Sequence, residues 1–262
     1  MSQFDRHQKA MAQLMRENAR RYRLHEVFRD FCELAAIALS NAVDRIHYDK
    51  REARYLDIIK RYERAEIDRF PAMLAELVES LECGFHDALG QLFMSLELGD
   101  HWKGQFFTPY EIASLMARMT LGNVADQVQR QGFITVNEPA CGAGAMVIAT
   151  AHAMRDQGLN YQTSMHVIAQ DIDATAVHMA YVQLALLHVP AIVVHGNSLA
   201  LTKWDHWATP AHVLGMWDRR LRRGQAADAG ELAKSAAPKP DDVRAEIVRQ
   251  RIEKAEQLSL FA

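Results

Sequence analysis

The chain has 262 residues, of which 49% are hydrophobic, and a formal net charge of −3 at pH 7. This length and composition allow one or two buried cores, whereas the longest apolar runs, such as 35–39, are far too short to span a bilayer. The slightly negative charge does not indicate a general nucleic-acid binder. Three cysteines without a C-x-x-C pair argue against both a disulfide framework and a zinc site.

The first residues lack the charged and then apolar pattern of a secretory signal, so we expect a cytoplasmic protein. Positive charge is concentrated in two arginine clusters, at 16–23 and at 219–223. Each cluster is either a local basic surface suited to nucleic acid or a solvated helix face.

Apolar residues recur at helical spacing through the first hundred residues, which predicts an all-helical N-terminal domain over 1–100. The charged run 49–69 predicts an exposed helix within it. Three apolar stripes support the domain: Val27, Phe31, Leu34 and Ala38; Leu74, Leu77, Val78 and Leu81; Phe85, Leu89, Leu92, Phe93 and Leu96.

A helix start follows at 108–111. Thr108 is expected as the N-cap, Pro109 as the first helical residue and Glu111 as the partner in a capping box. The apolar stripe behind this start is expected to be buried; it consists of Ile112, Leu115, Met116 and Met119.

A second domain, over 101–217, alternates strand and helix patterns. Strands are expected at 133–136, 165–169 and 192–194, and helices at 143–154 and 175–187. This βαβαβ order predicts an α/β fold that contains half of a doubly wound, Rossmann-like parallel sheet. The sheet is expected to stop after Leu201, and the only further strand-like segment is 212–214.

The remaining residues, 218–262, are expected to form a linker, a helix and a tail. The linker is rich in Ala, Gly and Pro over 224–239, and Asp242 is placed to cap a last helix over 243–256.

A glycine-rich turn, 137–144, joins the first strand to the next helix. The dinucleotide fingerprint requires a third glycine where this chain has Val147, so a pyrophosphate is not the favoured ligand. Glu138, four residues before Gly142, points instead to a ligand with a cationic amine. Asp171, at the end of the second strand, is placed to accept hydrogen bonds from ribose hydroxyls, whereas Asp173 is either a second ligand or a helix cap.

Four motifs in this order resemble the adenine-N6 DNA methyltransferases, most closely the modification subunits of type I restriction systems. They are Gly104–Pro109, Asn137–Gly144, Gln170–Asp173 and Gly196–Leu199. The resemblance covers about 100–200 and implies an S-adenosylmethionine methyltransferase fold, S-adenosyl-L-methionine as the cofactor, DNA as the substrate, and a specificity subunit or second catalytic subunit as a further partner.

The resemblance also assigns cofactor contacts. Phe107 and Thr108 would lie near the methionine portion of the cofactor, and the glycine-rich turn would surround that portion. Asp171 would bind the ribose, and Asn197 would face the adenine. Ordinary alternatives are a capping box for Thr108, a core aromatic for Phe107 and a turn asparagine for Asn197. The cofactor-binding set is Phe107, Thr108, Glu138, Pro139, Gly142, Gly144, Asp171 and Asn197.

The family's base-holding motif, an Asp or Asn followed by two prolines and an aromatic residue, is missing. None of the seven prolines is adjacent to another. The segment 209–212 occupies the corresponding place but lacks the second proline and the aromatic residue. Trp204, Trp207 and Trp217 could stack on a base or lie in buried surface or a partner interface.

Two functions therefore remain: an adenine DNA methyltransferase, or a catalytically inactive relative with a binding or regulatory role. The tail resembles the peptide by which bacterial proteins bind the DNA polymerase sliding clamp, and an ordinary apolar C-terminus is the alternative. Its expected contact residues are Gln257, Leu258, Leu260 and Phe261.

Overall fold

The computed structural model describes residues 4–96 and 107–224. Its contacts divide the chain into two compact units, 1–217 and 218–262. The expected domain boundary near residue 100 lies outside the described residues, as do the expected linker, last helix and clamp-binding tail. In the second unit, 218–224 are helical. Within the described residues, no helix is long and apolar enough to cross a membrane.

The N-terminal region is all-helical, as the apolar stripes predict. The cap of its first helix is a complete capping box, in which the Asp5 side chain and the Gln8 side chain each accept from the other's backbone amide. Its helices are α1 (Arg6–Asn18), α2 (Leu24–Asn41), α3 (Tyr48–Ile59), α4 (Arg64–Ile67), α5 (Arg69–Glu82) and α6 (Ala88–Ser95).

Most of the predicted stripe residues are buried, including Val27, Phe31 and Leu34, whereas Ala38 and Val78 are exposed. The charged run 49–69 is not one helix, since it is divided among α3, α4 and the start of α5. It departs from its expected exposure at Glu66 and, more strongly, at Arg51. This side chain is buried because its guanidinium lies 3.9 Å from the centre of the Trp207 ring and 2.7 Å from the Asp44 carboxylate.

The sheet has four strands in the order β1-β2-β3-β4. The first three are parallel, and they are β1 (Ile134–Glu138), β2 (Met165–Asp171) and β3 (Ala191–Asn197). The fourth, β4 (Thr202–Ala208), pairs antiparallel with β3. The predicted fold class, a truncated doubly wound Rossmann-like sheet with a helical N-terminal region, is confirmed.

Two predictions about the end of the sheet are wrong. The sheet does not stop after Leu201, because β4 follows immediately and folds back on β3. The segment 212–214 is not a strand, because it belongs to the short helix α12 (Pro210–Leu214), which Thr209 caps by accepting from the His212 amide.

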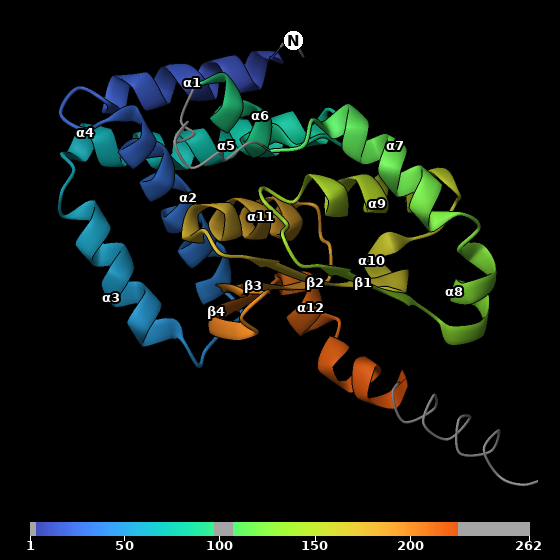
Figure 1. The fold of residues 1–262 in the computed structure, drawn as a ribbon. Coiled ribbons are helices and arrows are strands. Elements are labelled where there is room, and N and C mark those ends of the chain that lie inside the picture. Colours follow the sequence, from blue (N-terminus) through green and yellow to red (C-terminus); the bar gives the residue numbers. More distant parts are fainter. Residues whose placement is uncertain (1–3, 97–106, 225–262) are drawn as a thin grey trace, which may run out of the picture. The chain divides into compact units, whose positions relative to one another are not determined.

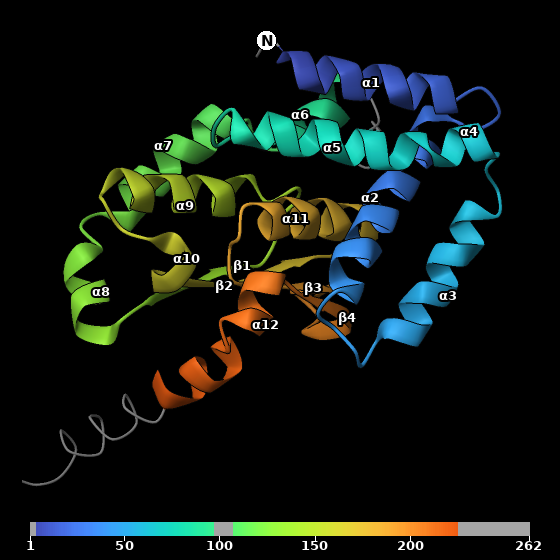
Figure 2. The same ribbon diagram turned by 180° about the vertical axis from the view of Figure 1, so that it is seen from behind.

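Two of the helices between the strands form a layer on one face of the sheet (Figure 1). In this layer α9 (Ala145–Asp156) packs against β1 and β2, and α11 (Ala174–Leu186) packs against β2 and β3. Figure 2 shows the same layer from behind, and α7 (Tyr110–Leu121) packs against α9. Two shorter helices, α8 (Ala125–Gln131) and α10 (Tyr161–Ser164), precede β1 and β2.

The predictions for α7 need two corrections. Its N-cap is Pro109, without a side-chain hydrogen bond, so the expected capping box of Thr108 and Glu111 does not form. Its buried face consists of Tyr110, Ala113 and Ala117 and packs against α9. The two alanines allow the helices to approach closely, and the Tyr110 hydroxyl is hydrogen-bonded to His152 of α9. The stripe expected to be buried is exposed instead: Ile112 50%, Leu115 57%, Met116 48% and Met119 76%.

Candidate cofactor crevice

Three of the predicted site residues end three neighbouring parallel strands. Glu138 is the last residue of β1, Asp171 of β2 and Asn197 of β3. Because the carboxyl ends of parallel strands meet at one edge of the sheet, these three residues lie at the edge where a doubly wound fold forms its ligand crevice. Ligands of open α/β sheets bind at this edge.

The glycine turn is tied directly to Asp171. The backbone amide of Gly142 donates to Asp171 Oδ2 at 2.8 Å, and the amide of Asp173 donates to Oδ1 at 2.9 Å. A third bond, from the Cys141 amide to the Gln170 carbonyl, is 2.8 Å long. The Asp171 carboxylate is therefore fixed in orientation between the two loops.

Phe107 lies against the same turn. Gly142 has a φ of +53°, and a Cβ built there would lie 2.8 Å from Cδ1 of Phe107. The ring is half-buried, and its centre lies 5.0 Å from that of Phe93. Phe107 is therefore compatible with both expectations for it, a core aromatic residue and a cofactor-site residue, because it packs on the core and also covers the turn.

Two further residues near the carboxyl ends of the strands, Asn197 and Ser198, form local hydrogen bonds. Ser198 Oγ donates to the Pro139 carbonyl at 2.6 Å, which joins the loop after β1 to the loop after β3. Asn197 Oδ1 accepts from the Leu199 and Ala200 amides at 3.0 and 2.9 Å, as expected of a turn asparagine. Thr108 is exposed and borders a cavity of about 620 Å³ with Phe107.

Asp173 is a helix cap. Its Oδ1 accepts from the Ala176 amide at 3.0 Å at the start of α11. Gly144 has a φ of +98°, so this glycine serves the conformation of the turn; a Cβ there would make an ordinary contact with the Cα of Ala180 on α11, at 3.5 Å.

The electrostatic environment of the turn is negative. Burial raises the pKa of the Cys141 thiol, and the carboxylates of Asp171 and Glu138 raise it further. The carboxylates of Asp171 and Glu138 therefore both contribute negative potential at the Cys141 thiol. A negative crevice favours a cationic ligand.

Gln183 is a site-positioning residue that the sequence pattern did not reveal. It is fully buried on α11, and its Nε2 donates to the Ala143 carbonyl and to Asp87 Oδ1, both at 2.8 Å. Its Oε1 accepts from the Leu89 amide at 3.1 Å. Gln183 therefore links the glycine turn to the start of α6. A glutamine within an apolar helix was the only available signal.

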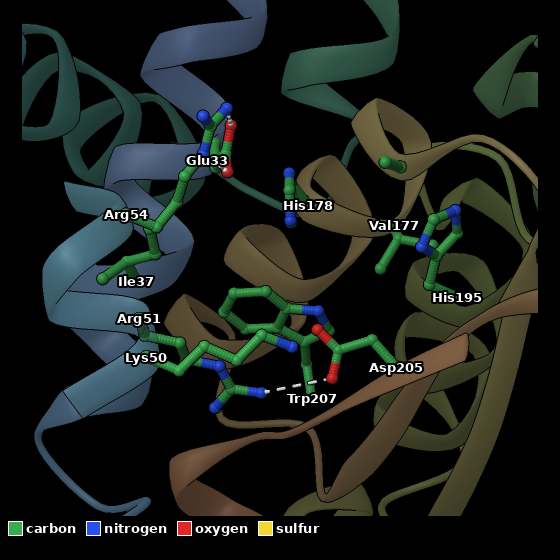
Figure 3. A pocket seen from close by; sticks show the side chains of 11 residues that line it. Glu33, Ile37, Lys50, Arg51, Arg54, Val177, His178, His195, Asp205 and Trp207 are labelled. Carbon is green, nitrogen blue, oxygen red and sulfur yellow. Dashed lines mark hydrogen bonds and ion pairs between the residues drawn. The ribbon is translucent and has the colours of Figure 1, made fainter. Parts of the chain in front are cut away.

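A second cavity lies apart from this crevice (Figure 3). It has a volume of about 320 Å³ and lies between α2 and α3 on one side and α11, β3 and β4 on the other. Arg54 is paired with Glu33 there, at 2.6 Å, and Arg51 lies over Trp207. Trp207 therefore belongs to this interface rather than to the crevice, whereas Trp204 is 56% exposed.

Residues 93–214 match the family model for N-6 DNA methylases. S-adenosyl-L-methionine is the cofactor that this match implies. The matched region contains the glycine turn, all the predicted cofactor-binding residues and the whole sheet.

Two solved structures are similar to the chain. One, from Listeria monocytogenes, is assigned to the class I S-adenosylmethionine-dependent methyltransferases, with 15% identity and a TM-score of 0.42; the match covers 76% of this chain and 56% of that one. The other is the methyltransferase subunit of a type I restriction-modification system from Streptococcus thermophilus, with 16% identity, a TM-score of 0.38 and coverages of 76% and 59%. This chain thus spans less than two thirds of either. The comparison with curated proteins gives no match.

Replacing Gly142 with alanine should weaken cofactor binding, because the new Cβ would displace the Phe107 ring. The backbone strain at positive φ would itself cost about 1 kcal/mol. Gly122 is the matched control, because it has the same φ of +53° with nothing within 4 Å of its built Cβ. Titration calorimetry should show a larger Kd for Gly142→Ala and an unchanged Kd for Gly122→Ala. Equal affinities for both variants and the parent would contradict the assignment of Phe107.

The buried His178 should make the protein less stable in acid. Burial lowers its pKa to about 4 from 6.5, although Glu33 opposes the shift, so the unfolded chain binds more protons between these values. The free energy of unfolding should therefore fall by about 1 kcal/mol between about pH 7.5 and pH 5.5. Urea denaturation at both pH values should show this loss reduced in His178→Gln. An identical pH dependence in the two proteins would refute the prediction.

Proposed function

We propose that this chain binds S-adenosyl-L-methionine at the carboxyl ends of β1, β2 and β3 and acts on DNA as an adenine-N6 methyltransferase component. The observation that carries the proposal is the hydrogen bond from the Gly142 amide to Asp171, on a turn that Phe107 covers. It supports the proposal because three segments singled out separately in the sequence meet at one crevice. The match of 93–214 to N-6 DNA methylases adds to this support.

The residues at the crevice suit a sulfonium nucleoside. The Asp171 carboxylate, oriented by two amides, can accept hydrogen bonds from ribose hydroxyls on its remaining lone pairs. Glu138 and Asp171 favour a positive charge near the turn. Phe107 and the glycines allow an apolar, close-fitting contact, and the Asn197 amide group lies at the third strand end. The bound cofactor would supply an activated methyl group.

A catalytically inactive relative is the second candidate. It is favoured by one observation, the absence of any two adjacent prolines in the chain, so that the base-holding motif of the resembled family is missing. Such a protein would keep the cofactor crevice and act as a binding or regulatory protein.

Two measurements on the purified full chain test the proposal. Titration calorimetry should detect S-adenosyl-L-methionine binding, and transfer of a labelled methyl group to unmethylated lambda DNA should separate the two candidates. Binding with transfer above background supports the enzyme, and binding without transfer supports the inactive relative. An absence of binding at saturating cofactor refutes both.

The tail adds a proposed partner, the bacterial sliding clamp. The sequence Gln257-Leu258-Ser259-Leu260-Phe261 is the basis of this proposal. Two leucines and a phenylalanine on a short extended segment can fill an apolar groove, while the glutamine amide fixes the register. Purified clamp should bind the full chain and lose binding to Phe261→Ala. Equal binding to both would refute this partner.

A further inference from the structure

The cavity between the helical region and the sheet has the size and lining of a small-molecule site (Figure 3). Its volume of about 320 Å³ falls within the range of ligand pockets, roughly 300 to 1,000 Å³. Its walls come from α2, α3, α11, β3 and β4, and they are mainly apolar. Ile37, Val177 and the Trp207 indole form much of the apolar wall. Such a lining suits a ligand with an apolar body and a few polar contacts.

His178 is an unusual polar residue of this cavity. It is 8% exposed, and its ring centre lies 5.0 Å from that of Trp207. Its Nδ1 atom is covered and has no hydrogen-bond partner among the described residues. Leaving a buried polar atom unpaired costs about 1 to 3 kcal/mol, and most such atoms in proteins have a partner. An unpaired imidazole in the cavity wall therefore points to a ligand with a polar group at this place.

The two arginines of the lining are held by carboxylates. Arg54 donates from Nε and Nη2 to the Glu33 carboxylate, at 2.6 and 2.8 Å. Arg51 donates to Asp44 at 2.7 Å and lies 3.9 Å from the Asp205 carboxylate. Both guanidinium groups are therefore fixed in position, and their charges are largely balanced within the protein.

Lys50 is a lining cation that no described carboxylate balances. Its side chain is exposed and extends from α3 toward the sheet (Figure 3). On the other side of the cavity, Ala174 and Val177 belong to the first four residues of α11, where the helix macrodipole favours negative charge. The ammonium group and the helix start both favour an anionic group on the ligand.

We propose that this cavity binds a small monoanion with an apolar or aromatic body, of the monocarboxylic acid class. The carboxylate pairs with Lys50 and accepts from the His178 imidazole, while the body packs against Val177 and Trp207. This site lies beyond the proposed function and does not depend on it. S-adenosyl-L-methionine is a poor ligand here, because its cationic sulfonium suits the negative crevice and not a cavity lined by a lysine and two arginines.

Titration calorimetry of the purified full chain with paired probes tests the site. The probes are benzoate, cyclohexanecarboxylate and indole-3-acetate, each compared with its neutral amide, and inorganic phosphate as an anion without an apolar body. At least one acid should bind saturably with a Kd of about 1 mM or tighter, as expected for a ligand of this size. It should bind at least about tenfold more tightly than its amide and than phosphate.

Three substitutions locate the bound acid. Lys50→Met keeps the apolar stem and should weaken binding by about fivefold, the effect of losing one exposed ion pair. Lys60→Met is the matched control, because it removes an exposed lysine that follows the same helix and pairs with Asp57; it should leave binding unchanged. Ala174→Leu enlarges an exposed side chain of the lining without changing any charge, and it should abolish binding by filling the cavity.

Four results would overturn the proposal. They are saturable binding of none of the acids, equal binding of an acid and its amide, an equal loss in Lys50→Met and Lys60→Met, and unchanged binding to Ala174→Leu when circular dichroism shows that this variant is folded. The Asp171→Ala variant keeps this site apart from the cofactor crevice, because it should bind the acid as tightly as the parent does. Loss of the acid in that variant would also contradict a separate site.

Discussion

Replacing Asp171 with alanine should reduce the affinity for S-adenosyl-L-methionine by about 1 to 3 kcal/mol, the usual cost of losing charged hydrogen bonds to a bound ligand. This change corresponds to roughly 5- to 150-fold in Kd. Two effects combine, because the variant loses the proposed ribose acceptor and also the acceptor that holds the Gly142 amide at 2.8 Å. Titration calorimetry measures the change directly.

Asp173 provides the matched control for this prediction. Its carboxylate lies two residues away and caps α11, so Asp173→Asn keeps a good capping side chain while removing a neighbouring charge. We expect a Kd within about twofold of the parent, because a surface charge of this kind contributes little. The assignment of Asp171 would be refuted if the two variants bound the cofactor equally well.

Replacing Gln183 with leucine should lower the free energy of unfolding by about 2 to 4 kcal/mol, because a buried carboxylate loses its partner and a leucine cannot replace the lost hydrogen bonds. The Asp87 side chain is 3% exposed, and burial already raises its pKa. Among the side-chain hydrogen bonds of the described residues, the variant would leave Asp87 with the one from the Gly90 amide at 2.8 Å. Chemical denaturation followed by circular dichroism gives the loss.

A double-mutant cycle with Asp87→Asn separates the pair from the surrounding packing. Asparagine preserves the cap of α6 but removes the charge, so Gln183→Leu should cost less in that background. Additive effects of the two substitutions would show that the carboxylate and the amide do not interact. We also expect Gln183→Leu to weaken cofactor binding, because Gln183 holds the Ala143 carbonyl of the turn.

The sequence was most informative where residue type and element boundary coincide. The last residues of β1, β2 and β3 were recognisable because a polar residue interrupts an apolar run at each strand end. The glycine turn was recognisable because the positive φ of Gly142 and Gly144 restricts the choice of residue. The boundaries themselves moved by as much as two or three residues, since neighbouring strands rather than local patterns decide where pairing ends.

Other features depend on contacts that no local pattern encodes. β4 contains Lys203, Asp205 and His206, which are unfavourable for a buried strand but acceptable in an edge strand that has one exposed face. Four apolar residues of α7 have the spacing of a buried helix face but are exposed, because no described element covers them: Ile112, Leu115, Met116 and Met119. The role of Gln183 arises from α6, about ninety residues earlier in the chain.

A crystal structure of the full chain at saturating S-adenosyl-L-methionine would test the central claim most directly. We expect cofactor density at the carboxyl ends of β1, β2 and β3, with ribose hydroxyls within hydrogen-bonding distance of Asp171 and the Phe107 ring against the ligand. An empty crevice at saturation, or density only in the cavity between Trp207 and His178, would contradict the account.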